Sequence, residues 1–155
     1  MNKTLKKVLV IGLIGLLLGG SYGGYLYFKP HRDIQNVEVF VEIEAAQLVD
    51  EYLDDMNAAN EKYLDAEGES KVIIVKGIIK SIDTDQNNQL VAVLRSNNDE
   101  LGVSCTFTAE SNKNAASLKV GDQLKVKGVV RAGAEYDADL ELYEDAIVEK
   151  CDIVE

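Results

Sequence analysis

The sequence predicts a mainly β domain, a five-stranded barrel that follows helical N-terminal segments. Two stretches carry most of this prediction, Lys71–Asp83 and Leu124–Ala134. Each contains Val-Lys-Gly, then two β-branched residues and a cation, which is the composition of a long strand with a glycine at a bend. The third observation is the order of elements, because the helical stretch among the strands lies between the third and the fourth.

The expected strands are separated by stretches rich in turn-forming residues. Their ranges are Lys71–Asp83, Gln89–Arg95, Gly102–Glu110, Gln123–Ala132 and Leu140–Ile153, with a break expected in the last one. The short helix is expected at Asn112–Leu118. This is the element order of an OB-fold, a partly open Greek-key barrel, in which Gly77 and Gly128 would mark the bends of the first and fourth strands.

The N-terminal segment, 1–29, has the features of a membrane anchor. Three lysines precede Val8–Phe28, which contains no charged residue, and about 20 apolar residues cross a bilayer as a helix. The lysine asymmetry predicts a single pass with the C-terminal domain outside the cytoplasm, in the periplasm or at the cell surface. A cleaved signal peptide is the alternative, because Val8–Leu18 resembles an apolar signal core and small residues follow it.

Glycines recur every four residues within this segment, at Gly15, Gly19 and Gly23. A stripe of small residues lets two membrane helices approach closely, which predicts a homodimer through this helix. The alternative is that glycine is simply common in membrane helices.

The region 30–68 is predicted to be a juxtamembrane segment with one amphipathic helix. Apolar residues at spacings of three and four form its stripe: Leu48, Tyr52, Met56, Ala59 and Tyr63. Upstream of them, Val37–Ile43 alternates in polarity and reads partly as a strand. We expect the stripe to pack on the barrel domain, 69–155.

The charge of the chain opposes one class of ligand. After Phe28 there are 13 cations against 27 carboxylates, a formal charge of −14. Affinity for nucleic acid depends mostly on cations that neutralise phosphates. The composition therefore disfavours nucleic acid as a partner, and it also suits a protein that must stay soluble.

The strands that usually bind ligands in OB-folds carry few suitable side chains. Single-strand binders use the second and third strands and adjacent loops, with cations and stacking aromatic rings. Here the second strand has Arg95 and no aromatic residue, and the third has Phe107. The loop after the fourth strand and the start of the fifth strand are acidic and form a candidate ligand lip, made of Glu135, Tyr136, Asp137, Asp139, Glu141 and Tyr143.

The carboxylates of this lip allow three interpretations. Asp137, Asp139 and Glu141 alternate along one expected strand, so they should project from one face. A divalent cation or a basic partner surface would relieve their repulsion. A solvated edge that deters aggregation is the simpler interpretation, and the sequence assigns no metal site.

Two cysteines, Cys105 and Cys151, are the complete cysteine content. In an exported domain we expect a disulfide between them, and two buried thiols are the alternative. The one histidine, His31, lies beside the apolar segment, so a Ser-His-Asp triad cannot be built in the barrel. No phosphate-binding loop motif is present, and we expect no catalytic residues and no cofactor.

Several motifs, taken in order, resemble those of a known family. The segment Asn57–Glu155 resembles the tRNA-anti-like family of small bacterial OB-fold proteins. The matching residues are Asn60-Glu61-x-Tyr63, Val75-x-Gly77-Ile78-Ile79-x-Ser81-Ile82, Val103-x-Cys105-x-Phe107, Leu118-x-x-Gly121-Asp122-x-Leu124-x-Val126-x-Gly128 and Cys151-x-Ile153-Val154. The resemblance implies the fold and often an export or anchor segment, and it implies no settled activity.

We therefore expect a membrane-tethered, non-catalytic OB-fold binding module that acts outside the cytoplasm on a protein or another non-nucleic partner. The alternative is an OB-fold protein that binds single-stranded nucleic acid, which the fold permits and the charge opposes.

Overall fold

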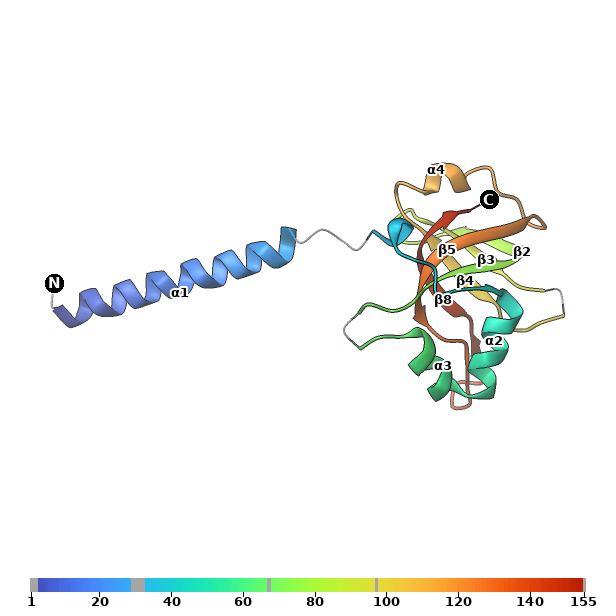
Figure 1. Cartoon of the computed structure of the whole chain (residues 1–155), viewed down its shortest axis with the longest axis horizontal. Coiled ribbons are helices and arrows are strands. Elements are labelled where there is room, and N and C mark those ends of the chain that lie inside the picture. The colour runs from blue at the N-terminus through green and yellow to red at the C-terminus, as the bar shows by residue number, and fades with distance from the viewer. Residues whose placement is uncertain (1–2, 29–32, 67, 97, 155) are drawn as a thin grey trace. The chain divides into compact units, whose positions relative to one another are not determined.

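The computed structural model describes residues 3–28, 33–66, 68–96 and 98–154. The chain forms two compact units, Met1–Arg32 and Asp33–Glu155 (Figure 1). The helical region 45–63, expected upstream of the barrel domain, belongs to the same unit as the barrel.

Helix α1 (Lys3–Phe28) covers the segment predicted as an anchor. Gly15, Gly19 and Gly23 lie on it, and a Cβ atom at any of them would have no neighbour within 4 Å. The helix is as predicted, but the membrane crossing is not confirmed: among the described residues, no helix is long and apolar enough to span a bilayer. Membrane orientation and self-association stay predictions.

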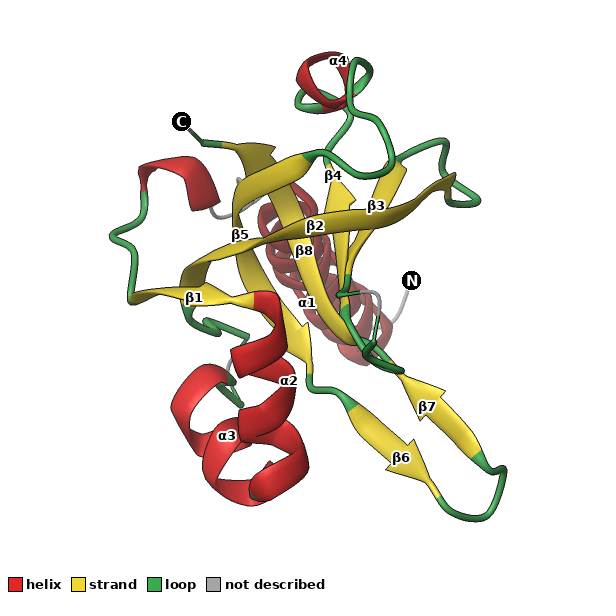
Figure 2. Cartoon of the chain, turned by 90° about the vertical axis from the view of Figure 1, so that its right-hand side faces the viewer, coloured by secondary structure: helices red, strands yellow, loops and turns green. Residues whose placement is uncertain are grey.

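Five strands close a mixed barrel in the second unit, in the order β2-β3-β4-β8-β5, with β5 returning to β2 (Figure 2). They are β2 (Val72–Thr84), β3 (Leu90–Leu94), β4 (Val103–Phe107), β5 (Gln123–Ala132) and β8 (Ala146–Ile153). Neighbours are antiparallel except β4 and β8, which are parallel. This arrangement is consistent with the predicted OB-fold.

The two glycine-containing strands pair on both sides, as the sequence predicts. β2 pairs with β5 up to Ile78 and with β3 from Ile79 onward. β5 has a register shift against β8 at Gly128, where a Cβ atom would lie 2.6 Å from a methyl carbon of Val148 and 2.9 Å from the sulfur of Cys151. Gly128 therefore allows the close approach of β8.

Two partial expectations are confirmed, and one element differs from the prediction. A short strand, β1 (Val41–Glu44), lies at the end of the alternating stretch and adds to β2 in parallel. The expected last strand is broken into β7 (Leu142–Glu144) and β8, and β7 forms a separate hairpin with β6 (Glu135–Asp137). Helix α4 (Asn112–Ala115) is shorter than expected.

The single amphipathic helix predicted for this region is wrong, because the chain forms two helices there. These are α2 (Ala45–Asp54) and α3 (Met56–Tyr63). Asp55 between them is extended (φ −149°), and its carboxylate accepts a hydrogen bond from the Ala58 amide at 3.0 Å. An aspartate in this position caps the second helix. The break moves Met56 out of the apolar stripe, leaving it 41% exposed, whereas the other four stripe residues are buried.

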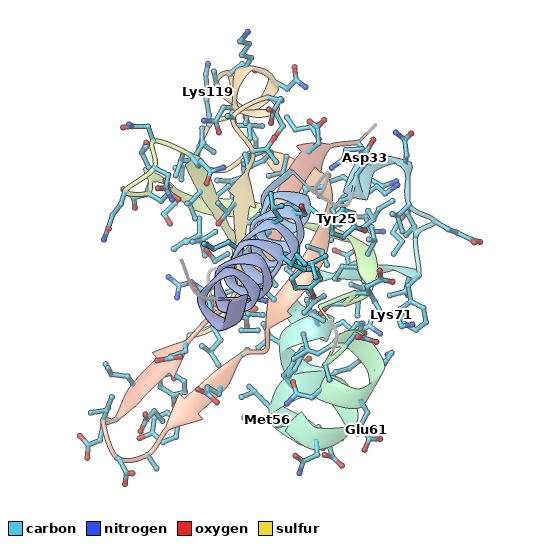
Figure 3. All side chains as sticks on the ribbon, turned by 90° about the vertical axis from the view of Figure 1, so that its left-hand side faces the viewer. Tyr25, Asp33, Met56, Glu61, Lys71 and Lys119 are labelled. Atoms are coloured by element: carbon cyan, nitrogen blue, oxygen red, sulfur yellow. The ribbon has the colours of Figure 1, made fainter. Side chains whose placement is uncertain are left out.

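The two ends of the barrel are covered by different helices. α4 lies at one end and α2 with α3 at the other (Figure 2). Figure 3 shows the same separation, with Lys119 at the first end and Met56 and Glu61 at the second. Leu48 and Tyr52 of α2 belong to the same core cluster as strand residues such as Val75, so α2 closes the second end with apolar contacts.

Gly133 lies against the ring of Tyr52 on this helix. It directly follows β5, and a Cβ atom there would overlap the ring of Tyr52, which is almost fully buried. The absence of a side chain at Gly133 is therefore what lets Tyr52 enter the end of the barrel.

We expect Gly133→Ala to lower the free energy of unfolding by about 1–3 kcal/mol, because an added methyl group forces a packed ring to move. Chemical denaturation of the full chain measures this loss. In a Tyr52→Leu background the same substitution should cost much less, because the ring is gone. Equal losses of unfolding free energy in both backgrounds would show that the cost of the added methyl group does not come from the Tyr52 ring.

The two cysteines lie together in the core. Cys105 on β4 and Cys151 on β8 are both fully buried and present as free thiols. Burial, together with a hydrogen bond to the Cys105 side chain, raises the pKa of Cys151. The structure thus brings the predicted pair into contact, and the disulfide itself stays a prediction.

We expect chain isolated from an oxidising compartment to carry the Cys105–Cys151 bond, because a buried pair in contact needs little rearrangement to close. Alkylation before and after unfolding, read by mass spectrometry, measures this. Chain made in a reducing cytoplasm is the control, and its thiols should react only after unfolding. Two reactive thiols in unfolded, freshly exported chain would contradict the bond.

Candidate functional site

The outer face of β3 and β4 offers little to a nucleic acid. Burial alternates along both strands, which are fully described, so that Val91 and Val93 face outward beside Thr106 and Ser104. Phe107 is completely buried. The aromatic ring that the sequence placed on the third strand is therefore part of the core, and the outward residues of β3 and β4 themselves include no stacking ring and no cation.

The candidate lip is the exposed hairpin of β6 and β7. Tyr136 and Tyr143 oppose each other across it, with ring centroids 4.7 Å apart, and each is about half exposed. Glu135 opposes Glu144. The hairpin therefore presents an aromatic pair flanked by carboxylates, which is the composition that the sequence predicts.

The expected alignment of Asp137, Asp139 and Glu141 along one strand is wrong. Asp137 ends β6, and the other two lie in the turn before β7. The Asp137 carboxylate accepts hydrogen bonds from the amides of Asp139 and Leu140 at 2.8 and 3.0 Å, which stabilises the turn. Among the described residues, no three His, Cys, Asp or Glu side chains are grouped to hold a metal ion.

The cations of the domain have a marked preference for the outer face of β2 and β5. Both strands are fully described, and Asp83 is the one carboxylate on either. Their cations are Lys76, Lys80, Lys125, Lys127 and Arg131. We call these five side chains the basic face.

The middle of the basic face borders a hollow of about 560 Å³. Lys76 and Lys125 line it, together with Arg95 from the end of β3 and Ala45 and Ala46 from the first turn of α2. The N-terminus of a helix exposes unpaired amide groups and attracts anions. We call this space the cationic hollow, because a helix N-terminus and three cations border it.

Two carboxylates of β1 balance part of this charge. Glu42 contacts Lys76 at 3.3 Å and Lys125 at 3.2 Å, and Glu44 contacts Lys76 at 3.1 Å. Hydrogen bonds from Lys125 and Lys76 lower the pKa of Glu42, and the bond to Glu44 does most to raise the pKa of Lys76. Lys76 and Lys125 are directly paired in the sheet, so the carboxylates offset a like-charge repulsion.

Arg95 is held by one end of its guanidinium group. Nη1 donates a hydrogen bond to the Glu100 carbonyl at 2.7 Å, while Nε is buried and has no partner among the described residues. Sequence reasoning noted Arg95 but missed the hollow, since its lining comes from β1, α2, β2, β5 and the residues that follow β3. The signal that was available is the alternation of Lys125, Lys127 and Arg131 in the sequence, which places three cations on one face.

Comparison with solved structures supports the fold. A proposed nucleic acid-binding lipoprotein from Klebsiella pneumoniae matches with a TM-score of 0.54 and 16% identity, over 81% of this chain and 99% of that chain. A proposed aspartyl-tRNA synthetase from Leishmania major matches with a TM-score of 0.42 and 12% identity, over 81% of this chain and 22% of that chain. At these identities the likeness to the lipoprotein concerns the fold.

The remaining comparisons concern sequence. No curated protein matches the chain. The model of the tRNA_anti-like family matches residues 1–140. The match begins at the N-terminus and ends in the β6–β7 turn, whereas the resemblance seen in the motifs covers Asn57–Glu155. Since the matched part is most of the sequence, the chain belongs to the tRNA_anti-like family.

Proposed function

We propose that this protein is a non-catalytic OB-fold binding module whose ligand is single-stranded nucleic acid, bound along the basic face and the cationic hollow. The observation that carries the proposal is the segregation of charge. The paired strands β2 and β5 carry five cations and one carboxylate, within a unit that is strongly acidic. Membership of the tRNA_anti-like family, and the description of the Klebsiella protein as nucleic acid-binding, support the same ligand class.

The hollow has suitable chemistry for a phosphate group. Lysine and arginine side chains and a helix N-terminus are the common phosphate ligands of proteins. Lys76 and Lys125 form ion pairs with Glu42 and Glu44, and the two lysine side chains are 38% and 32% exposed. Exposed ion pairs contribute little stability, so the carboxylates can move away from the lysines at a small cost in free energy when a phosphate binds.

Two properties of the sequence oppose a nucleic-acid ligand: the lack of stacking rings on the usual binding strands and the negative charge of the domain. Each has its own consequence for binding. Because β3 and β4 present no stacking ring, affinity must depend on phosphate contacts, which makes it weak and sensitive to salt. The acidic surfaces elsewhere repel the strand and direct it toward the basic face. The non-nucleic partner favoured by the charge is supported less well by the comparisons than this alternative.

The structural match to the Klebsiella protein also supports an exported, membrane-associated protein, because that protein is described as a lipoprotein. This chain has no cysteine before Cys105, and Cys105 is buried in the barrel. A lipid on an N-terminal cysteine is therefore not available to these residues, and we assign the tether to α1.

The test uses the full chain in a mild nonionic detergent and a fluorescein-labelled oligothymidine, with fluorescence anisotropy measured across a series of salt concentrations. Each phosphate contact contributes about 0.7 to the slope of log affinity against log salt for single strands. We expect Lys76→Gln with Lys125→Gln to weaken binding and to reduce this slope by about 1.4.

The matched control is Lys113→Gln with Lys150→Gln, which removes the same charge from α4 and β8, outside the cationic hollow. It should leave the slope nearly unchanged. Equal effects of the two double variants would mean that only net charge matters, and an absence of binding at low salt would refute the proposal.

A further inference from the structure

A second hollow borders α2, and its charge is opposite to that of the first. Its volume is about 380 Å³, and its lining comes from α2, from the loop before β4 and from Tyr143 of the hairpin. Three carboxylates border it, from Asp50, Asp99 and Glu100, and its described lining contains no cation. We call it the acidic hollow. Ala46 lines both hollows, so the first turn of α2 separates them.

The base of the acidic hollow is apolar. Val49 and Leu101 are each 5% exposed, and they form part of its lining. Leu53 and Tyr143 also line it, and each remains 51% exposed. These two side chains give the border of the hollow exposed apolar surface that a partner could cover.

The aromatic wall of the acidic hollow is held in place from two sides. The ring of Tyr143 packs against that of Tyr136 across the hairpin. A hydrogen bond with the Glu100 side chain connects Tyr143 to the loop before β4, and this bond raises the pKa of Tyr143. Tyr143 thus has a neighbour on the hairpin and another in the loop that borders the hollow, which limits the ordering needed when a partner binds against it.

We propose that the acidic hollow docks a basic segment of a partner protein, with an arginine or lysine side chain entering between Tyr143 and the carboxylates. The aliphatic part of such a side chain suits Leu53 and Val49, and its charged end suits the three carboxylates. The face of a tyrosine ring adds a cation–π attraction. Charge complementarity selects a basic occupant, because phosphate groups and acidic segments would be repelled from this hollow.

This inference goes beyond the proposed function, because it concerns a different hollow and an oppositely charged partner. The two sites have separate charged side chains, with Lys76, Lys125 and Arg95 at the first and Asp50, Asp99 and Glu100 at the second. The failure of either proposal would therefore leave the other standing.

The probe is the peptide acetyl-Leu-Arg-Leu-Arg-Leu-amide, titrated into the full chain in nonionic detergent and followed by calorimetry. Its counterpart with glutamate in place of arginine should not bind. We expect Asp50→Asn with Asp99→Asn to weaken binding of the basic peptide by about tenfold, since both carboxylates border the hollow. Leu53→Ser, a change at a half-exposed position, should weaken binding without unfolding the chain.

The matched control is Asp139→Asn with Glu141→Gln, which removes the same charge from the hairpin turn, outside the lining of the acidic hollow. It should change affinity less than about twofold. Equal weakening by both double variants would overturn the proposal in favour of nonspecific attraction to an acidic protein, and so would equal binding of the glutamate peptide. Self-association that the Asp50 and Asp99 changes abolish, measured by sedimentation, would instead assign the hollow to a second copy.

Discussion

The pairing of β2 with β5 is the constraint on which the rest of the domain depends. Residues from Val72 to Ile78 pair with residues from Val129 to Gln123, and this seam closes the barrel. Closure removes two sheet edges that would otherwise be open. It also fixes side-chain direction, because buried and outward residues alternate along much of both strands and the five cations all fall among the outward ones. The core and the basic face are thus two sides of one strand pair.

Closure leaves one end of the barrel to be filled by α2. Tyr52 occupies this end because Gly133 has no side chain, and Gly77 lies under Ala45 with only 3.3 Å between a Cβ at Gly77 and the Cβ of Ala45. The first turn of α2 is thereby held beside Lys76 and Lys125, and its last turn beside the loop before β4. The packing of a single helix therefore positions the walls of both hollows.

Much of the fold could be predicted from the sequence because its signals are local. The β-branched runs and their glycines predicted β2 and β5 within a residue or two, and the order of elements predicted the barrel. The break at Asp55 was missed because the apolar spacing continues across it, although an aspartate before Met56 is a helix cap. A strand through Asp139 and Glu141 was wrongly predicted, because alternation alone does not distinguish a strand from a turn held by Asp137.

The candidate sites could be predicted only in part, and the reason is physical. The lip residues Tyr136 and Tyr143 are close in sequence and were both identified there. The cationic hollow instead joins residues from β1, α2, β2 and β5 and from the segment that follows β3. The formal charge of the whole domain sums charges that are too far apart to interact, since screening limits the range of each to roughly 8–10 Å in physiological salt.

Local charge, rather than total charge, therefore decides what each hollow can hold. Glu42 and Glu44 illustrate the distinction, because they belong to the acidic excess of the chain and yet lie within 3.1–3.3 Å of the lysines. They hold Lys76 and Lys125 in place on the basic face. Because these ion pairs are partly exposed, breaking them costs little free energy. The carboxylates of Asp50 and Asp99, on the other side of the same helix turn, border a hollow whose described lining has no cation to perform that role. An acidic domain of this construction can present two surfaces of opposite sign because its fold, and not its composition, sets where each charge lies.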